Sequence, residues 1–182
     1  MPREYKIIFS GSMGAGKTTA IQALSEVSAI KTDVTNTDKA QHSKETTTVA
    51  MDYGEITLEG GDRLRLYGTP GQARFDFMWK ILAKGALGLI VLVDNSREDP
   101  VNDMLSFIDS FGEILARQAV VVGVGRCETH PVPTIDDYYA ALSERNINIP
   151  LFSCDVRKAE DVLMLVQTLL SIAATLPSDL NN

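Results

Sequence analysis

The sequence contains few of the residues that build cross-linked or metal-bound scaffolds. Of its 182 residues, two are cysteines and two are histidines. The cysteines, Cys127 and Cys154, lie far apart and do not have the spacing of metal ligands. We therefore expect both to be free thiols in a reducing compartment.

The sequence also lacks a long apolar run. The longest such run, 86–93, has eight residues and contains Gly88, whereas a helix that crosses a membrane needs about 20. No apolar leader segment follows Met1, and neither end carries a lipidation signal. We expect no stable membrane insertion and a cytoplasmic location.

Acidic residues outnumber basic residues. The chain has 17 Lys and Arg against 24 Asp and Glu, so its formal net charge is −7. This balance gives no general basic surface for nucleic acid or anionic lipid, so nucleic acid is not an expected partner. A hydrophobic fraction of 45% with 23% charged residues is typical of a soluble globular protein.

Strand-like and helix-like segments alternate along the chain. Apolar runs and alternation predict strands at 5–10, 48–58, 62–67, 86–93, 119–124 and 150–154. Apolar residues at helical spacing predict helices at 17–27, 75–82, 104–115 and 162–173. The polar, Thr-rich stretch 30–48 has no period and is predicted to be a long functional loop.

This alternation predicts a single α/β domain over residues 1–182. The runs 86–93 and 119–124 are continuously apolar, which is typical of parallel strands covered on both faces. Gly60-Gly61 separates two strand segments and indicates an antiparallel hairpin. We expect a mostly parallel six-stranded sheet with one antiparallel hairpin strand and helices on both faces.

The strongest motif runs from Gly11 to Thr18 and matches G-x-x-x-x-G-K-[ST] between a predicted strand and a predicted helix. Gly11 and Gly16 permit a backbone that turns successive N–H groups toward one concavity. Lys17 supplies a charge for β- and γ-phosphates, and the Thr18 hydroxyl can bind Mg²⁺. The motif predicts a nucleotide-binding P-loop. The remaining predicted phosphate-binding residues are Ser12, Met13, Gly14, Ala15 and Thr19.

Two later segments extend this motif at spacings found in Ras-like GTPases. They are Thr46-Thr-Thr-Val-Ala-Met-Asp-Tyr-Gly54 and Tyr67-Gly-Thr-Pro-Gly-Gln72, the latter followed by Phe75-Asp-Phe-Met-Trp79. With the P-loop, they make the chain resemble the bacterial MglA-like and conservon-type small GTPases. The resemblance implies a Ras-like P-loop NTPase domain with switch I at about 30–48 and switch II at about 68–80.

The resemblance also implies roles for residues in both switches. Thr48 would close over the γ-phosphate and Mg²⁺, with Thr46 and Thr47 as competing candidates; the three threonines also suit the start of a strand. Gly71 would contact the γ-phosphate through its N–H, and Gln72 would orient the attacking water. Lys17, Thr48 and Gln72 are thus the catalytic candidates, and Thr18 and Thr48 are the metal ligands.

Some positions depart from the GTPase pattern. Gly68 stands where Ras-like proteins have an Asp near Mg²⁺, as in MglA-like relatives, and Asp52 is a candidate substitute. The guanine-reading N-K-x-D is replaced by Gly125-Arg126-Cys127-Glu128. Glu128 can accept from guanine N1 and N2, and the Arg126 stem can lie over the base. Ser153 matches the third base-binding loop, but the following Lys is lost. Guanine preference therefore comes from the resemblance alone.

The leading interpretation is a switch that binds GTP or GDP with Mg²⁺ and hydrolyses GTP slowly. By resemblance, a roadblock-type regulator and an effector bound at the switch II face are the expected partners. Phe75, Met78 and Trp79 share one helical face that either contacts a partner or packs on the sheet. The alternatives are a non-hydrolysing scaffold and a small P-loop metabolite kinase. Scattered arginines disfavour the kinase.

Overall fold

The structure, a computed structural model, describes residues 2–25, 30–34, 49–71, 76–112 and 118–176. Its strands are β1 Glu4–Gly11, β2 Ile30–Val34, β3 Val49–Thr57, β4 Arg63–Gly68, β5 Gly88–Asp94, β6 Ala119–Gly125 and β7 Leu151–Ser153. Its helices are α1 Lys17–Leu24, α2 Asp76–Ala83, α3 Pro100–Phe111, α4 Ile135–Glu144 and α5 Ala159–Ala173. The helices α1, α2, α3 and α5 overlap the predicted helical segments, whereas α4, between β6 and β7, was not among the helices that periodicity predicted.

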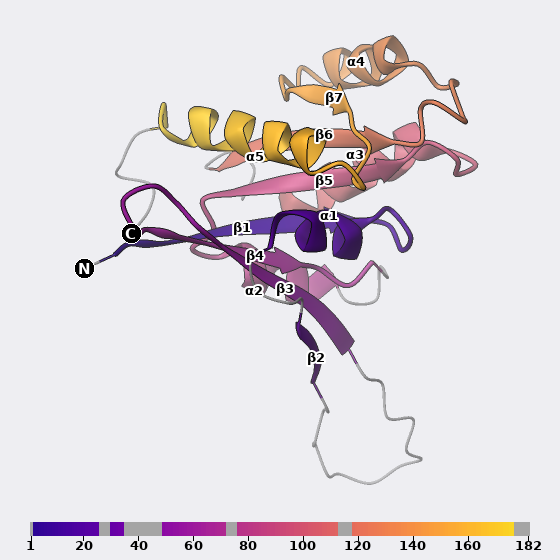
Figure 1. The fold of residues 1–182 in the computed structure, drawn as a ribbon. Helices are drawn as coiled ribbons and strands as arrows, with labels where there is room; N and C mark the ends of the chain where they lie inside the picture. The colour runs from indigo at the N-terminus through magenta and orange to yellow at the C-terminus, as the bar shows by residue number, and fades with distance from the viewer. Residues whose placement is uncertain (1, 26–29, 35–48, 72–75, 113–117, 177–182) are drawn as a thin grey trace, which may run out of the picture.

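All the described strands form one sheet in the order β2-β3-β4-β1-β5-β6-β7 (Figure 1). The strands from β4 through β1, β5 and β6 to β7 are mutually parallel, whereas β3 is antiparallel to both of its neighbours. The α/β class, the mostly parallel sheet and the antiparallel hairpin strand are confirmed. This architecture is that of a P-loop NTPase-like fold.

The described sheet contains one strand more than predicted, because β2 lies inside the segment interpreted as loop. Ile30 pairs with Tyr53 and Val34 pairs with Val49 in an antiparallel ladder. The sequence Ile-Lys-Thr-Asp-Val gave no signal because pairing with β3, rather than a hydrophobic pattern, makes this segment a strand. The rest of predicted switch I, 35–48, lies outside the described residues.

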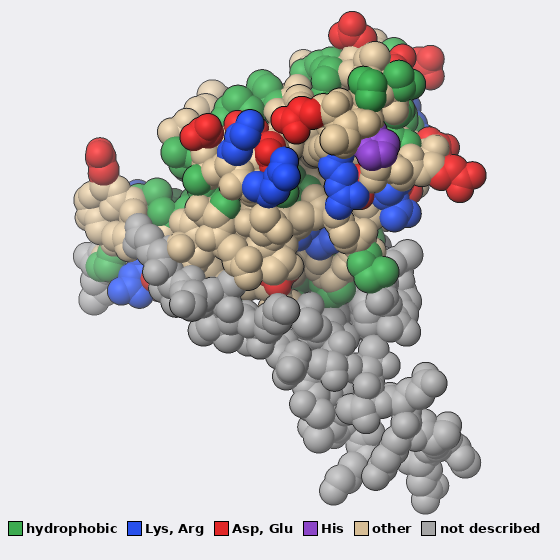
Figure 2. Space-filling model, turned by 45° about the vertical axis from the view of Figure 1, so that its right-hand side comes forward, with side chains coloured by type: hydrophobic (Ala, Val, Ile, Leu, Met, Phe, Trp, Pro, Cys, Tyr) green, Lys and Arg blue, Asp and Glu red, His purple; other side chains and the backbone are tan. Residues whose placement is uncertain are grey.

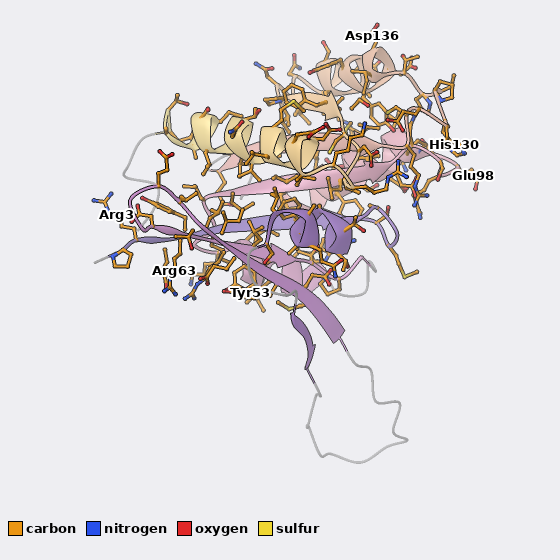
Figure 3. The ribbon with its side chains drawn as sticks, in the orientation of Figure 1. Arg3, Tyr53, Arg63, Glu98, His130 and Asp136 are labelled. Carbon is orange, nitrogen blue, oxygen red and sulfur yellow. The ribbon has the colours of Figure 1, made fainter. Side chains whose placement is uncertain are left out.

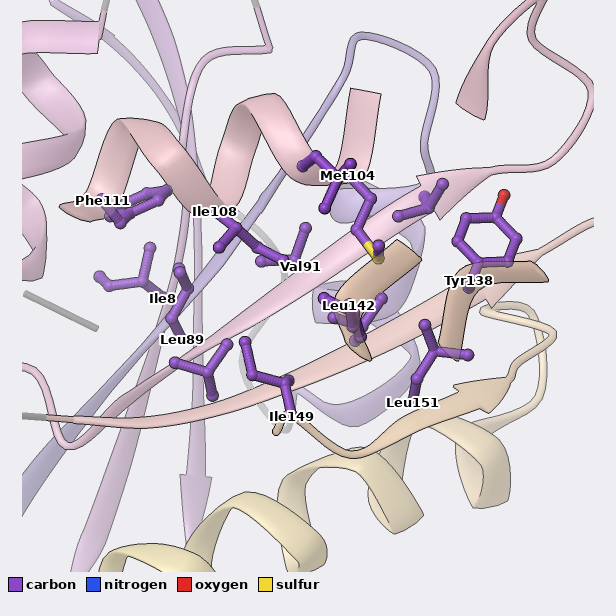
Figure 4. Close-up of a cluster of buried hydrophobic side chains, with 14 of the residues drawn as sticks. Ile8, Leu89, Val91, Met104, Ile108, Phe111, Tyr138, Leu142, Ile149 and Leu151 are labelled. Carbon is purple, nitrogen blue, oxygen red and sulfur yellow. The ribbon is translucent and has the colours of Figure 1, made fainter. Parts of the chain in front are cut away.

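Two apolar layers cover the sheet. On one face, α1 and α5 pack over inward side chains of β1, β4, β5 and β6, including Ile7, Phe9, Leu66, Ile90 and Val121. On the other face, α2, α3 and α4 cover Ile8, Leu89, Val91, Val122 and Val124. Figure 4 shows part of this second layer, with Met104, Ile108 and Phe111 of α3 over the strands. Consecutive residues of the central strands thus enter opposite cores, which explains their continuously apolar sequences.

The helix α5 lies close to β6 because the sheet has a glycine where they touch. A Cβ built on Gly123 would lie 2.7 Å from the Leu165 side chain and 3.1 Å from that of Leu92. Leu165 itself is fully buried. At 15 residues, α5 is the longest described helix, and every described helix falls short of what a bilayer crossing requires.

The loops after the parallel strands meet at the carboxyl edge of the sheet. In Figure 3, Glu98 from the loop after β5 and His130 from the loop after β6 lie at this end, whereas Arg3 and Arg63 lie at the other. Ligands of open α/β sheets bind outside the carboxyl ends of the strands. The P-loop, which follows the central strand β1, opens at this edge.

We expect Gly123→Ala to destabilise the protein by about 1–3 kcal/mol, because the added methyl group overpacks the contact between α5 and the sheet. Urea unfolding measures the change. Leu163→Ala is the matched control, because Leu163 is on the same helix but 42% exposed, and we expect it to change stability by no more than about 0.5 kcal/mol. Equal stability of Gly123→Ala and the wild type would contradict this packing.

Candidate functional site

The P-loop has a backbone that only glycine can supply at two positions. Gly11 has a φ of 141° and Gly16 has a φ of 95°. A Cβ on Gly11 would lie 2.1 Å from the carbonyl oxygen of Leu92, and one on Gly16 would lie 2.7 Å from the Val156 side chain. Turns through positive φ direct neighbouring N–H groups toward a common concavity, which suits an anion.

Lys17 holds a buried positive charge beneath this loop. Its ammonium group donates to the carbonyl oxygens of Gly11 and Ser12, both at 2.8 Å, and the residue is 8% exposed. Burial lowers the pKa of Lys17 to about 8, although the nearby carboxylate of Asp52 opposes the shift. A phosphate group at the loop would supply the counter-charge that the two carbonyls provide only in part.

The N-terminus of α1 has no side-chain cap. Gly16 occupies the N-cap position, whereas Asp99 caps α3 and Thr134 forms a capping box with Asp137 at α4. The first N–H groups of a helix have no partner within the helix. In α1 these donors are directed toward the P-loop concavity, where an anion can accept from them.

Thr18 and Asp52 form a pair of hard oxygen donors beside the loop. The Thr18 hydroxyl donates to the Asp52 carboxylate at 2.5 Å. Asp52 lies on β3 directly opposite Gly68 of β4, and a Cβ on Gly68 would lie 3.0 Å from that of Asp52. Hydroxyl and carboxylate oxygens suit Mg²⁺. The carboxylate from β3 thus reaches the Thr18 hydroxyl beside the position where the usual Asp is missing.

The start of predicted switch II is anchored on three sides. Thr69 donates through its hydroxyl to Ser10 at 3.0 Å, and the Trp79 indole donates to the Pro70 carbonyl at 2.9 Å. A Cβ on Gly71 would lie 2.5 Å from the backbone nitrogen of Met13, so this glycine lies against the P-loop backbone. Gln72, Thr48 and its alternatives Thr46 and Thr47 lie outside the described residues.

The predicted apolar face of α2 is used at least partly for packing. Trp79 is only 3% exposed, and its ring stacks on Phe111 with centroids 5.9 Å apart and contacts Phe107 at 4.9 Å. The packing interpretation therefore holds for Trp79. Phe75 and the side chain of Met78 lie outside what the structure describes.

A cavity of about 410 Å³ opens beside the P-loop. It brings together predicted site residues from three distant segments. They are Gly14, Ala15, Gly16 and Thr19 of the P-loop and α1, Arg126 and Glu128 after β6, and Ser153 at the end of β7. Figure 2 shows basic side chains gathered on the face that carries the single purple histidine, although the whole chain is negative.

Arg126 links the loop after β6 to the P-loop. Its guanidinium donates to the Gly14 carbonyl at 3.2 Å and to the Ser96 hydroxyl at 3.0 Å, and it pairs with the buried Asp94 carboxylate at 2.7 Å. Its φ of 65° is rare for a residue other than glycine. Arg126 thus lies at the cavity beside the P-loop, and its contact with a base stays a prediction, whereas Asp94 was not among the predicted site residues. Its place at the carboxyl end of the buried strand β5 was the available signal.

A buried amide holds the loop that carries Arg126 and Glu128. The Asn95 side chain donates to the carbonyls of His130 and Pro133 at 2.6 and 2.9 Å. Its oxygen accepts from the Tyr138 hydroxyl at 2.5 Å. These bonds satisfy Asn95 inside the protein, where it is 2% exposed, and give this wall of the cavity a fixed shape.

The opposite strand, β7, leads into an ion pair at the cavity. Asp155 accepts from the side chain of Arg157 at 2.8 Å through both of its oxygens. These bonds lower the pKa of the Asp155 carboxyl to about 2. The sequence analysis did not predict Asp155 and Arg157 as site residues, because their side chains meet only through the turn that follows β7. Cys127 and Cys154 also line the cavity and are free thiols.

The chain belongs to the family described as "conserved hypothetical ATP binding protein", whose sequence profile matches residues 28–128. The match covers more than half of the chain and begins after the P-loop. The chain is also similar to an uncharacterized protein of Methanocaldococcus jannaschii, with 33% identity over 94 residues. That alignment covers 52% of this chain and spans about half, 53%, of the relative. The family description supports nucleotide binding.

The buried ammonium predicts how stability depends on pH. Because the pKa of Lys17 falls from 10.5 to about 8 on folding, the unfolded chain binds more protons between these pH values. Stability relative to Lys17→Met should therefore rise from pH 8 to 10.5, by up to about 3 kcal/mol. Urea unfolding of both proteins across this range measures the difference.

The control for this experiment is a variant that loses a lysine from the surface. Lys84→Met removes an exposed lysine and controls for the general effect of that loss. If the difference in the free energy of unfolding between wild type and Lys17→Met stays constant from pH 8 to 10.5, burial does not lower the pKa of Lys17.

Proposed function

We propose, taking membership of this ATP-binding family as the premise, that the chain is a nucleotide-dependent switch. It binds GTP or GDP with Mg²⁺ and hydrolyses GTP slowly, and the bound nucleotide sets the surface offered to partner proteins. The carrying observation is the buried Lys17 ammonium beneath a glycine-shaped anion concavity. Beside it, Gly71 lies against the P-loop backbone, so the start of predicted switch II meets the P-loop where a γ-phosphate would end.

The P-loop would hold the phosphates through its backbone and through Lys17. Successive N–H groups and the uncapped start of α1 provide donors, and the ammonium provides a charge. Lys17 is already fixed by two carbonyl oxygens in the described structure. Binding therefore requires little reorientation of this side chain, which favours affinity.

Thr18 and Asp52 would hold Mg²⁺, with Thr48 joining them from switch I. The Thr18 hydroxyl already donates a hydrogen bond to the Asp52 carboxylate. A Mg²⁺ ion close to both groups would replace this hydrogen bond and take the two oxygens as ligands. The metal would neutralise charge on the β- and γ-phosphates. Asp52 would here serve the role that Gly68 cannot serve.

Gln72 would orient the attacking water and Gly71 would donate its N–H to the γ-phosphate. These are positioning roles, which is how proteins mainly accelerate phosphoryl transfer. Lys17 and Thr48 would stabilise the charge on the transferred group. Gln72 follows directly on a residue that touches the P-loop, which supports this assignment.

The structural effect of hydrolysis would reach α2 through the start of switch II, which contacts both the P-loop and this helix. Gly71 touches the P-loop, and its neighbour Pro70 accepts from Trp79 on α2. Loss of the γ-phosphate would therefore release a segment that is joined to α2. Ile81 on the same helix is 68% exposed, as is Met13 on the P-loop, so both offer apolar contacts to a roadblock-type regulator or an effector.

Asp52→Asn should remove most of the contribution of Mg²⁺ to nucleotide affinity, because a neutral amide binds this hard cation weakly. Titration of labelled GDP with Mg²⁺ and again with excess chelator measures the two affinities. We expect roughly tenfold or more loss with Mg²⁺ and little change without it. Asp109→Asn is the charge-matched control, because Asp109 pairs with Arg145 on the surface. Lys17→Ala should abolish binding in both conditions.

An equal loss of affinity with and without Mg²⁺ would remove Asp52 from the metal site while leaving nucleotide binding intact. Unaltered binding by Lys17→Ala would overturn the nucleotide site itself.

Gln72→Leu should slow GTP hydrolysis roughly tenfold or more while leaving GDP affinity unchanged, because only the orientation of water is lost. Single-turnover release of phosphate measures the rate. Gln167→Leu, an exposed position on α5, is the control and should hydrolyse at the wild-type rate. Equal rates for both variants would remove Gln72 from the mechanism. A wild type that binds GTP without turnover would favour the non-hydrolysing scaffold.

A further inference from the structure

We propose that Arg126 and Asp94 are positioning residues for the phosphates, because together they hold Gly14, in the middle of the P-loop, in the conformation that binds a phosphate chain. They act through the backbone of the P-loop and independently of the base of the nucleotide. This inference rests on the proposed function, since it concerns the phosphates of the nucleotide bound at the same loop.

Gly14 is the part of the P-loop that side-chain packing does not hold. A Cβ on Gly11 would collide with Leu92, and one on Gly16 would collide with Val156, so close neighbours fix both of these glycines. A Cβ on Gly14, in contrast, would have no described atom within 4 Å. Gly14 is exposed and has a φ of 83°. A glycine without packing has access to many backbone conformations, so another interaction must hold this turn.

Two hydrogen bonds hold the peptide group between Gly14 and Ala15 from opposite sides. The Gly14 carbonyl accepts from the Arg126 guanidinium at 3.2 Å, and the Ala15 N–H donates to the Ser12 carbonyl at 3.1 Å. The C=O and N–H of a trans peptide group lie in one plane and point in opposite directions, so these two bonds fix the orientation of that plane. The chain continues from this peptide group into the N-terminus of α1, whose N–H groups are directed toward the concavity. The orientation that Arg126 holds therefore sets the direction of those donors.

The Arg126 guanidinium is itself held by a buried carboxylate. Asp94 is 6% exposed and pairs with Arg126 through one oxygen at 2.7 Å. Its other oxygen accepts from the Ser96 N–H at 3.0 Å and from the Ser96 hydroxyl at 2.6 Å. The same hydroxyl accepts from Arg126 at 3.0 Å. Because Asp94 ends the central strand β5 and is the register partner of Gly125, these contacts connect the P-loop to the sheet.

The backbone of Arg126 is consistent with this role. Its φ of 65° is rare for a residue other than glycine, and such conformations persist where the surrounding structure holds them, often at ligand sites. The contacts of its side chain with Asp94, Ser96 and Gly14 provide that support. Since Asp94 balances the charge of Arg126, we infer that the pair contributes to phosphate binding by fixing the loop rather than by adding net charge.

Tripolyphosphate, which has phosphates but no base, separates this role from a contact with the base. Isothermal titration calorimetry with Mg²⁺ measures the affinities of the wild type and of Arg126→Ala for tripolyphosphate and for GDP. We expect Arg126→Ala to weaken the binding of both ligands by a similar factor, roughly tenfold, because a hydrogen bond from a charged donor to the loop is lost. Weaker binding of GDP alone would place Arg126 at the base and overturn the proposal.

The wild type provides two further outcomes. If it binds GDP but not tripolyphosphate, the proposal is overturned, because the loop held by Arg126 then binds no phosphate chain in the absence of a base. If it binds neither ligand, the proposed function is overturned instead.

Asp94→Asn separates the position of the loop from the effect of charge. If charge alone mattered, removal of an anion near the phosphates would strengthen their binding. The amide of Asn, however, directs an NH₂ group at one of the donors on Arg126 or Ser96, which loosens the connection to the P-loop. We therefore expect weaker binding of tripolyphosphate, as in Arg126→Ala, and no further loss in the double variant. Unchanged or tighter binding by Asp94→Asn overturns the proposal.

Arg145→Ala and Asp109→Asn are the matched controls, since Arg145 and Asp109 also form an ion pair but lie away from the lining of the cavity beside the P-loop. Both variants should bind tripolyphosphate and GDP as the wild type does. Thermal melting confirms that each variant is folded. If Asp94→Asn does not fold, Ser96→Ala, which removes no charge, decides: weaker binding of tripolyphosphate supports the proposal, and unchanged binding overturns it.

Discussion

The buried charge of Lys17 is the constraint on which the rest of the site depends. An ammonium group held among backbone carbonyls is stabilised only in part, as its lowered pKa shows. The positive-φ turns of Gly11 and Gly16 place those carbonyls below the loop and leave N–H groups above it. An anion above the loop would complete the charge balance. The same glycines also allow β5 and the segment after β7 to approach closely.

The pairing of β3 with β4 places Asp52 opposite Gly68, the position at which the resemblance to Ras-like GTPases leads one to expect an aspartate. Asp52 and Gly68 are register partners, and a side chain at position 68 would press against Asp52. The glycine at position 68 and the Asp52 carboxylate beside Thr18 therefore belong to one arrangement: the small residue leaves room for the side chain that reaches Thr18. This arrangement supports the proposed Mg²⁺ site.

The two walls of the cavity beside the P-loop share one feature. Arg126 is tied to Asp94, and Asp155 is tied to Arg157, so charged groups on both walls are satisfied within the protein. A pocket of this kind is compatible with a family described as ATP-binding and with the resemblance to GTPases.

Local patterns in the sequence determined the P-loop, the alternation of strands and helices, and the buried parallel strands, because these depend on neighbouring residues and on backbone geometry. They also indicated Asp52 and Arg126 as candidates, but not their contacts. Only the tertiary structure decided that Ile30–Val34 pairs with β3, that Asp52 reaches Thr18, and that Asp94 holds Arg126. Each of these joins segments that are distant in the chain. Strand register and loop closure bring them together, and no periodicity within one segment encodes that pairing.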